Sequence, residues 1–126
     1  MRLSRIAFAA LVLAGAVPAL AASQGTAQTF LDRANRLKAK GPFALFDGDY
    51  KKLKAEAFAA GDSIRKDRIA AERVGKPILY CSLKARAQLG SMEFIHGLEA
   101  IPAAERARLS LKQAMLRILA TKYPCR

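Results

Sequence analysis

Apolar side chains recur every three or four residues in four segments of the chain, with charged side chains between them. This spacing places the apolar residues on one face of an α-helix. The segments cover about 26–40, 50–73, 91–101 and 110–123. The pattern predicts an all-α fold, a small single-domain bundle of about four main helices.

The first two helices are expected to be joined by a short apolar connector. Gly41 and Pro42 end the first helix, and the connector that follows is expected to press Phe43 and Phe46 into the core. Asp49 is predicted to cap the second helix. The buried stripe of that helix is expected to comprise Tyr50, Leu53, Ala57, Ala60, Ile64 and Ala71.

The last two main helices have clearer beginnings. Ser91 is expected to cap the first of them, whose inward side chains are predicted to be Phe94, Leu98 and Ile101. In the last helix, Ser110 and Gln113 have the spacing of a capping box, in which each side chain accepts a backbone hydrogen bond from the other residue. The final helix is therefore the best specified element.

The beginning of the chain has the parts of a secretory signal peptide. Arg2 and Arg5 precede an uncharged apolar run, and small residues stand at positions 19 and 21. The run, Ile6 to Leu20, is shorter than the roughly 20 residues that a membrane span needs. Residues 1–21 are therefore predicted to be removed near Ala21, leaving a helical domain over 22–126 that is periplasmic or secreted and not transmembrane.

The two cysteines of the chain, Cys81 and Cys125, both lie in the predicted exported domain. An exported protein enters an oxidising space, and two thiols allow only one intramolecular pairing. A Cys81–Cys125 disulfide is therefore expected to close the bundle by tying the end of the chain to its middle. Intermolecular pairing and free thiols are the alternatives.

The charge balance is strongly basic. The 126 residues carry a formal net charge of +12, and loss of the two signal-peptide arginines leaves +10. Such a charge favours anionic partners, such as an envelope surface or an acidic protein, although a solvated cationic surface explains it equally well. Nucleic acid is not expected, because the chain is exported and lacks aromatic residues interleaved with its basic faces.

Candidate chemistry is sparse. His96, with Glu93 and Glu99 three residues to either side, could in principle converge on a metal, but a di-iron bundle needs a second such motif and further carboxylates. A surface salt-bridge cluster is the favoured interpretation. No serine has the setting of a catalytic nucleophile, and no pair of carboxylates stands out. The sequence therefore predicts no catalytic residue, metal or cofactor, with a small hydrolase as the disfavoured alternative.

Residues 81–125 resemble the Tai-type (Rap/Tai) immunity proteins, small periplasmic helical proteins that protect bacteria against type VI secretion effectors. "FIHGLEA" is similar to the family's aromatic-Ile-x-Gly helix, "LSLKQAMLRIL" to its V-T-x-x-Q-L helix start, and "KYP" to its closing segment. Ser91 stands where the family usually has a cysteine. The resemblance implies a helical fold and a protein effector as partner.

The leading functional hypothesis is a non-enzymatic periplasmic binding protein that neutralises a secreted effector. Two surfaces are candidate partner contacts: an acidic one at Glu93, His96 and Glu99 with the adjoining 82–90 segment, and the basic face of 50–73. The basic face comprises Lys51, Lys52, Arg65 and Lys66, beside other cations. The alternative hypothesis is a general envelope protein that associates with anionic surfaces by charge.

Overall fold

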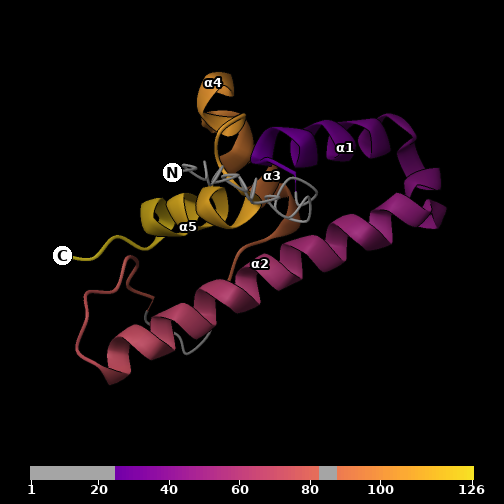
Figure 1. The fold of residues 1–126 in the computed structure, drawn as a ribbon. Helices are drawn as coiled ribbons and strands as arrows, with labels where there is room; N and C mark the ends of the chain where they lie inside the picture. The colour runs from indigo at the N-terminus through magenta and orange to yellow at the C-terminus, as the bar shows by residue number, and fades with distance from the viewer. Residues whose placement is uncertain (1–24, 83–87) are drawn as a thin grey trace, which may run out of the picture.

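Four main helices and two short helical turns make up the part of the chain that the structure, a computed structural model, describes: residues 25–82 and 88–126 (Figure 1). The elements are α1 Ala27–Ala39, the 3₁₀ helix η2 Gly41–Phe46, α2 Gly48–Arg73, α3 Ser91–Ala100, α4 Ala103–Arg106 and α5 Leu111–Lys122. Over these residues the only extended pairing is a single bridge between Thr26 and Ser110. The all-α prediction with four main helices is confirmed, and the predicted signal peptide lies outside the described residues.

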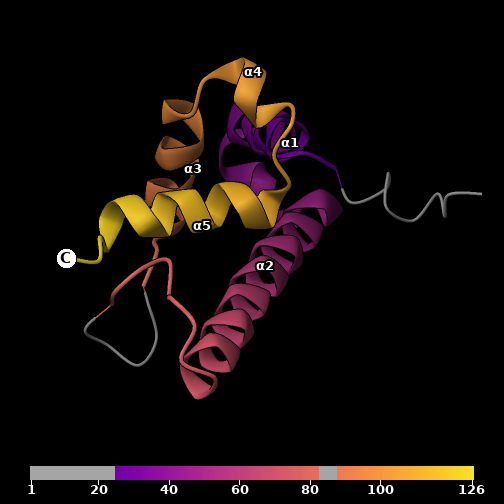
Figure 2. The same ribbon diagram turned by 60° about the vertical axis from the view of Figure 1, so that its left-hand side comes forward.

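The helices gather around one end of the long helix α2. With 26 residues, α2 is about 39 Å long. It runs back from the corner at η2, and α5 crosses it while α1 and α3 pack together on the same side (Figures 1 and 2). The far end of α2 reaches beyond the other helices before the chain turns back towards α3. This arrangement leaves one side of α2 less covered than the other.

The core lies where α1, α2, α3 and α5 meet. Leu98 is completely buried there, and the rings of Phe30 and Phe94 pack with centroids 5.6 Å apart. The buried residues are Ala27, Phe30, Leu31, Leu37, Leu53, Ala60, Ile64, Tyr80, Phe94, Leu98, Ile101, Leu111, Ala114, Met115 and Leu119. Phe94, Leu98 and Ile101 are therefore buried as predicted, and α1 and α5 each bury one face. In α2, Leu53, Ala60 and Ile64 are buried as expected, but Tyr50 is 36% exposed, so its place in the buried stripe is wrong.

The expectation that Phe43 and Phe46 pack into the core is also wrong, because their exposed fractions are 75% and 89%. A 3₁₀ helix has three residues per turn, so side chains three apart share one face. Half-buried Ala44 faces the core. Phe43 and Phe46, which are three apart, therefore share a different face and turn outward together.

The N-cap residues of α2 and α3 differ from the two that were predicted. Asp47, not Asp49, caps α2, and its side chain accepts from the Asp49 amide at 2.8 Å. Asp49 is thereby left to pair with Arg33 of α1 at 2.6 Å. Gly90, rather than Ser91, is the cap residue of α3, and it supplies no side-chain hydrogen bond. Both caps lie one or two residues earlier than predicted.

The beginning of α5 is as predicted. The Gln113 amide donates to Ser110 Oγ at 3.1 Å, and the Ser110 amide donates to Gln113 Oε1 at 2.9 Å. The capping box is therefore confirmed, and the adjoining bridge to Thr26 attaches it to the start of α1.

Helices α3 and α5 approach each other at a glycine. A Cβ atom on Gly97 would lie 2.8 Å from Ile118 Cδ1, closer than real Cβ contacts. The C-terminal end of α3 is bound by Arg106, whose Nη1 donates to the carbonyl of Leu98 at 3.1 Å and of Ile101 at 2.5 Å. A cation at this position satisfies carbonyls at the C-terminus of α3, which the helix itself leaves unpaired.

The C-terminal tail is fastened to the segment before α3. Cys81 and Cys125 form a disulfide with Cα atoms 4.9 Å apart, which confirms the predicted pairing. The Cys81 amide donates to the carbonyl of Tyr123 at 2.8 Å, and Tyr123 Oη donates to the carbonyl of Gln88 at 3.0 Å. Covalent and hydrogen bonds therefore hold the same two segments together.

Candidate functional site

The uncovered side of α2 forms one wall of a groove of about 1030 Å³, here called the apolar groove. Residues of α1, η2, α3 and α5 contribute the rest of its lining. Its floor is the outer surface of the core, represented by Phe30, Leu53 and Met115. The groove lies between α2 and the elements packed beside it, and its lining on α2 runs from Tyr50 to Glu72.

The walls of the apolar groove carry large apolar side chains in contact with solvent. Phe58 is 69% exposed, Met92 is 51% exposed and Ile69 is 37% exposed. Single exposed apolar residues are ordinary on a protein surface, but several around one concave space are typical of a binding site. Phe58 and Ile69 come from α2 and Met92 comes from α3, so the three face the groove from two sides.

Cations outnumber carboxylates around the apolar groove. Lys38, Lys54, Arg65 and Arg68 line it, against Asp62 and Glu72. Both carboxylates are already paired, because Asp62 lies 3.4 Å from Arg65 and 2.9 Å from Lys66, and Glu72 lies 3.0 Å from Arg68. The groove therefore offers an apolar floor beneath a rim of net positive charge.

Ion pairs fix the charged side chains next to the groove. The hydrogen bond to Glu72 raises the pKa of Arg68, and its guanidinium also lies over the Tyr80 ring at 4.8 Å from the centroid. The hydrogen bond to Lys66 and a second to Arg65 lower the pKa of Asp62 below its ordinary value. All of these groups therefore keep their charges at neutral pH.

A three-residue ion-pair cluster joins α1 to α2 near the same groove. Arg33 lies 2.6 Å from Asp49 and 2.8 Å from Glu56. The hydrogen bond to Asp49 raises the pKa of Arg33, and the same bond lowers the pKa of Asp49. The contact of Glu56 with Arg33 makes Glu56 a link between the two helices.

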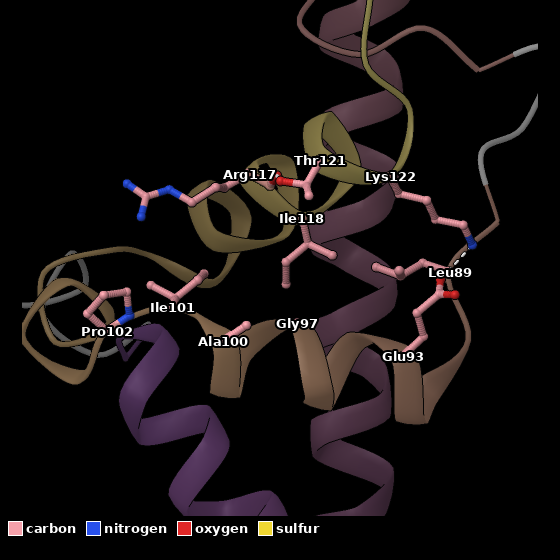
Figure 3. A pocket seen from close by; sticks show the side chains of 10 residues that line it. All are labelled: Leu89, Glu93, Gly97, Ala100, Ile101, Pro102, Arg117, Ile118, Thr121 and Lys122. Atoms are coloured by element: carbon pink, nitrogen blue, oxygen red, sulfur yellow. Dashed lines mark hydrogen bonds and ion pairs between the residues drawn. The ribbon is translucent and has the colours of Figure 1, made fainter.

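The predicted acidic surface is divided by the structure. Glu93 pairs with Lys122 of α5 at 2.5 Å, and that hydrogen bond raises the pKa of Lys122. The pair spans one side of a smaller hollow of about 400 Å³ between α3 and α5 (Figure 3). His96 and Glu99 are exposed on α3. Of the adjoining 82–90 segment, residues 83–87 lie outside the described residues.

The predicted basic residues of α2 fall into two groups. Lys51 and Lys52 are exposed in the first turn of the helix, next to η2. Arg65 lines the apolar groove, whereas Lys66 pairs with Asp62 at its edge. The structure therefore separates the basic face into a part near the corner of the molecule and a part near the groove.

The apolar groove is suited to binding by its apolar lining and its excess of cations. Over 25–82 and 88–126, no polar or charged side chain is buried, and no three residues of histidine, cysteine, aspartate or glutamate are grouped to hold a metal. Over the same residues, no helix combines the length and apolarity needed to cross a membrane. What the groove offers a ligand is apolar surface and positive charge.

Sequence reasoning missed the residues that line the groove walls. Phe58 lies off the buried stripe of α2, and an aromatic residue outside such a stripe was the available signal. Met92 gave no comparable signal, because it becomes part of a concave surface only when α3 is placed beside α2.

No family model, curated protein sequence or solved structure matches this chain. The resemblance of residues 81–125 to the Tai-type immunity proteins therefore stays a prediction. The groove, the ion pairs and the disulfide are the observations from which a function can be argued.

Proposed function

We propose that this chain is a non-enzymatic binding protein of an oxidising compartment such as the periplasm, and that it neutralises a secreted effector by holding a segment of it in the apolar groove. The observation that carries the proposal is the groove itself, with its exposed Phe58, Ile69 and Met92. The Cys81–Cys125 disulfide is consistent with such a compartment. The resemblance of 81–125 to the Tai-type family supplies the effector as the class of partner.

The shape and charge of the groove define the chemistry of its occupant. A long space with apolar walls suits an amphipathic helix, which places apolar side chains along one face. The excess of cations at the rim, including Lys38 and Lys54, suits acidic residues on either side of that face. The proposed occupant is therefore an apolar helical segment of the effector that is flanked by acidic residues.

The groove is preferred over the surface around Glu93, His96 and Glu99 for an energetic reason. Most of the binding free energy of protein interfaces comes from a few desolvated anchors, commonly large side chains. The groove supplies Phe58 as such an anchor, whereas Glu93 is already paired with Lys122. An exposed polar surface without apolar anchors contributes more to association rate than to affinity.

Site-specific photo-crosslinking in living host cells tests the proposal. A photoreactive phenylalanine analogue replaces Phe58 in the groove, and matched chains carry it at His96 on α3 or at Phe43 on η2. All three positions are exposed, so none of the replacements disturbs the core. The expected result is one dominant crosslinked protein from position 58 only, and that protein is toxic when expressed without this chain.

The same experiment can contradict the proposal in two separate ways. Crosslinking from position 96 but not from position 58 would reject the groove and favour the acidic surface. A groove-bound protein that is harmless without this chain would reject effector neutralisation and leave the groove as a binding site of another role.

A further inference from the structure

We propose that η2 is a membrane-docking tip that places its apolar side chains into the surface of a bilayer containing anionic phospholipids, a role separate from that of the groove. Phe43 and Phe46 are exposed, and Leu45 between them is 61% exposed. These three residues are called the η2 tip. They lie on η2, which Figure 1 places at the corner between α1 and α2, away from α4 and α5.

The η2 tip is held in place by its own backbone and by an ion pair. Gly41 has a φ of 60°, which favours glycine, and Pro42 fixes the first turn of the 3₁₀ helix. The Asp47 amide donates to the carbonyl of Ala44 at 3.0 Å, and the Asp47 carboxylate pairs with Lys40 across the turn. A surface that is already ordered loses little conformational entropy when it binds.

Cations outnumber carboxylates in the residues before and after the η2 tip. Residues 36–54 contain six lysines and arginines and only two carboxylates, Asp47 and Asp49. Both carboxylates are engaged, Asp47 with Lys40 and Asp49 with Arg33. The exposed cations of this stretch are Arg36, Lys38, Lys51, Lys52 and Lys54, besides Lys40. These cations are called the basic collar, and two of them, Lys38 and Lys54, also line the apolar groove.

This arrangement fits an anionic bilayer better than a second copy of the chain. In a bilayer, a layer of phosphate groups lies directly above apolar chains. An apolar tip flanked by cations can therefore contact the apolar chains and the phosphate groups at the same time. Two copies joined tip to tip would bring their two basic collars close together. The collars would then repel each other, because exposed charges interact over a screening length of about 8 Å. Charge complementarity therefore identifies the occupant, and it gives the expected anionic surface a defined contact site.

Tryptophan fluorescence tests insertion directly, because the chain contains no tryptophan. Phe46→Trp places a single reporter on the η2 tip, and Phe58→Trp places one in the groove as a matched control. The full chain is mixed with vesicles of phosphatidylglycerol and phosphatidylcholine in equal parts, or of phosphatidylcholine alone. The expected result is a blue shift for Phe46→Trp with the anionic vesicles and quenching by brominated acyl chains, without either effect for Phe58→Trp.

Vesicle sedimentation measures how strongly the chain and its variants partition onto the same vesicles. The double variant Phe43→Ser/Phe46→Ser is expected to lower the partition coefficient at least about ten-fold, because the lost rings leave only charge attraction. Lys51→Gln/Lys52→Gln is expected to lower it by a similar factor at low salt. Phe58→Ser, an equally exposed aromatic substitution outside the tip, is expected to stay within about two-fold.

The outcomes separate the docking tip from its rivals. Binding that is unchanged in Phe43→Ser/Phe46→Ser would overturn the proposal and leave attraction by charge alone. A blue shift of Phe46→Trp that grows with protein concentration in the absence of vesicles would overturn it in favour of self-association. Because the groove is probed by different residues, neither result bears on effector binding.

Discussion

The α3–α5 junction and the α1–α2 hairpin use their apolar residues in different ways. At the junction, Leu98 and Ala114 are completely buried, and Gly97 lets the two helices approach closely. On the hairpin, Phe43, Phe46 and Phe58 face solvent although they are among the largest apolar side chains of the chain. Burial of apolar area stabilises folding, so the first set holds the fold and the second is available for a ligand.

The two regions also differ in what fastens them. The junction adjoins the disulfide, which is covalent, and the capping box and Arg106, which act through local hydrogen bonds. The hairpin is joined by the cluster of Arg33, Asp49 and Glu56, which depends on ionised carboxylates. Both regions bury residues in the core, but the ion-pair cluster of the hairpin is expected to be more sensitive to pH than the bonds at the junction.

The largest expected effect is a cavity at the junction. Leu98→Ala removes a completely buried side chain and is expected to lower the free energy of unfolding by about 2–5 kcal/mol. Urea denaturation monitored by circular dichroism measures the change. A loss below about 1 kcal/mol would mean that the junction is not the main source of stability.

Loss of the disulfide comes next. Cys81→Ser/Cys125→Ser opens a link between residues 44 apart and is expected to cost about 2–4 kcal/mol. Native-state hydrogen exchange should show faster exchange in α5 and at Tyr123 before α1 is affected. Equal acceleration of exchange in every helix would contradict the local role assigned to the bond.

Arg106 tests the hydrogen bonds at the end of α3. Arg106→Ala removes charged donors from the carbonyls of Leu98 and Ile101, with an expected loss of about 2 kcal/mol. Arg108→Ala, at an exposed arginine on the same segment, is the matched control and is expected to change stability by less than about 0.5 kcal/mol. Equal losses in both variants would point to net charge and not to these bonds.

Acid tests the hairpin. The pKa of Asp49 is lowered by Arg33, so the contribution of this pair is complete above the ordinary aspartate pKa of about 4 and is lost as the pH falls below it. The melting temperature of the native chain is expected to stay constant from neutral pH to about pH 5 and then to fall. The melting temperature of the Asp49→Asn variant should fall less steeply with pH than that of the native chain. Parallel curves would show that the Arg33–Asp49 pair does not contribute to the acid sensitivity.

The sequence predicted the junction well and the hairpin poorly, for a physical reason. Helical periodicity and the Ser110–Gln113 capping box are local signals, and two cysteines have only one intramolecular pairing to form. The outward direction of Phe43 depends instead on whether η2 adopts three or 3.6 residues per turn, which its apolar composition does not reveal.

The candidate site could not be predicted because it is formed by the placement of several helices relative to one another. Phe58 and Met92 line one groove only when α2 and α3 are placed together, and no local pattern encodes that placement. The pairing of Arg33 with Glu56 likewise requires both helices in place.

The measurement that tests the central distinction most directly is urea denaturation of a triple variant of the exposed residues, Phe43→Ser/Phe58→Ser/Met92→Gln. Each substitution keeps a similar helix propensity and removes a side chain at least half exposed. If these residues serve ligands and not the fold, the free energy of unfolding should stay within about 1 kcal/mol of the native value. A loss approaching that of Leu98→Ala would show that these exposed side chains hold the fold, and it would contradict the account.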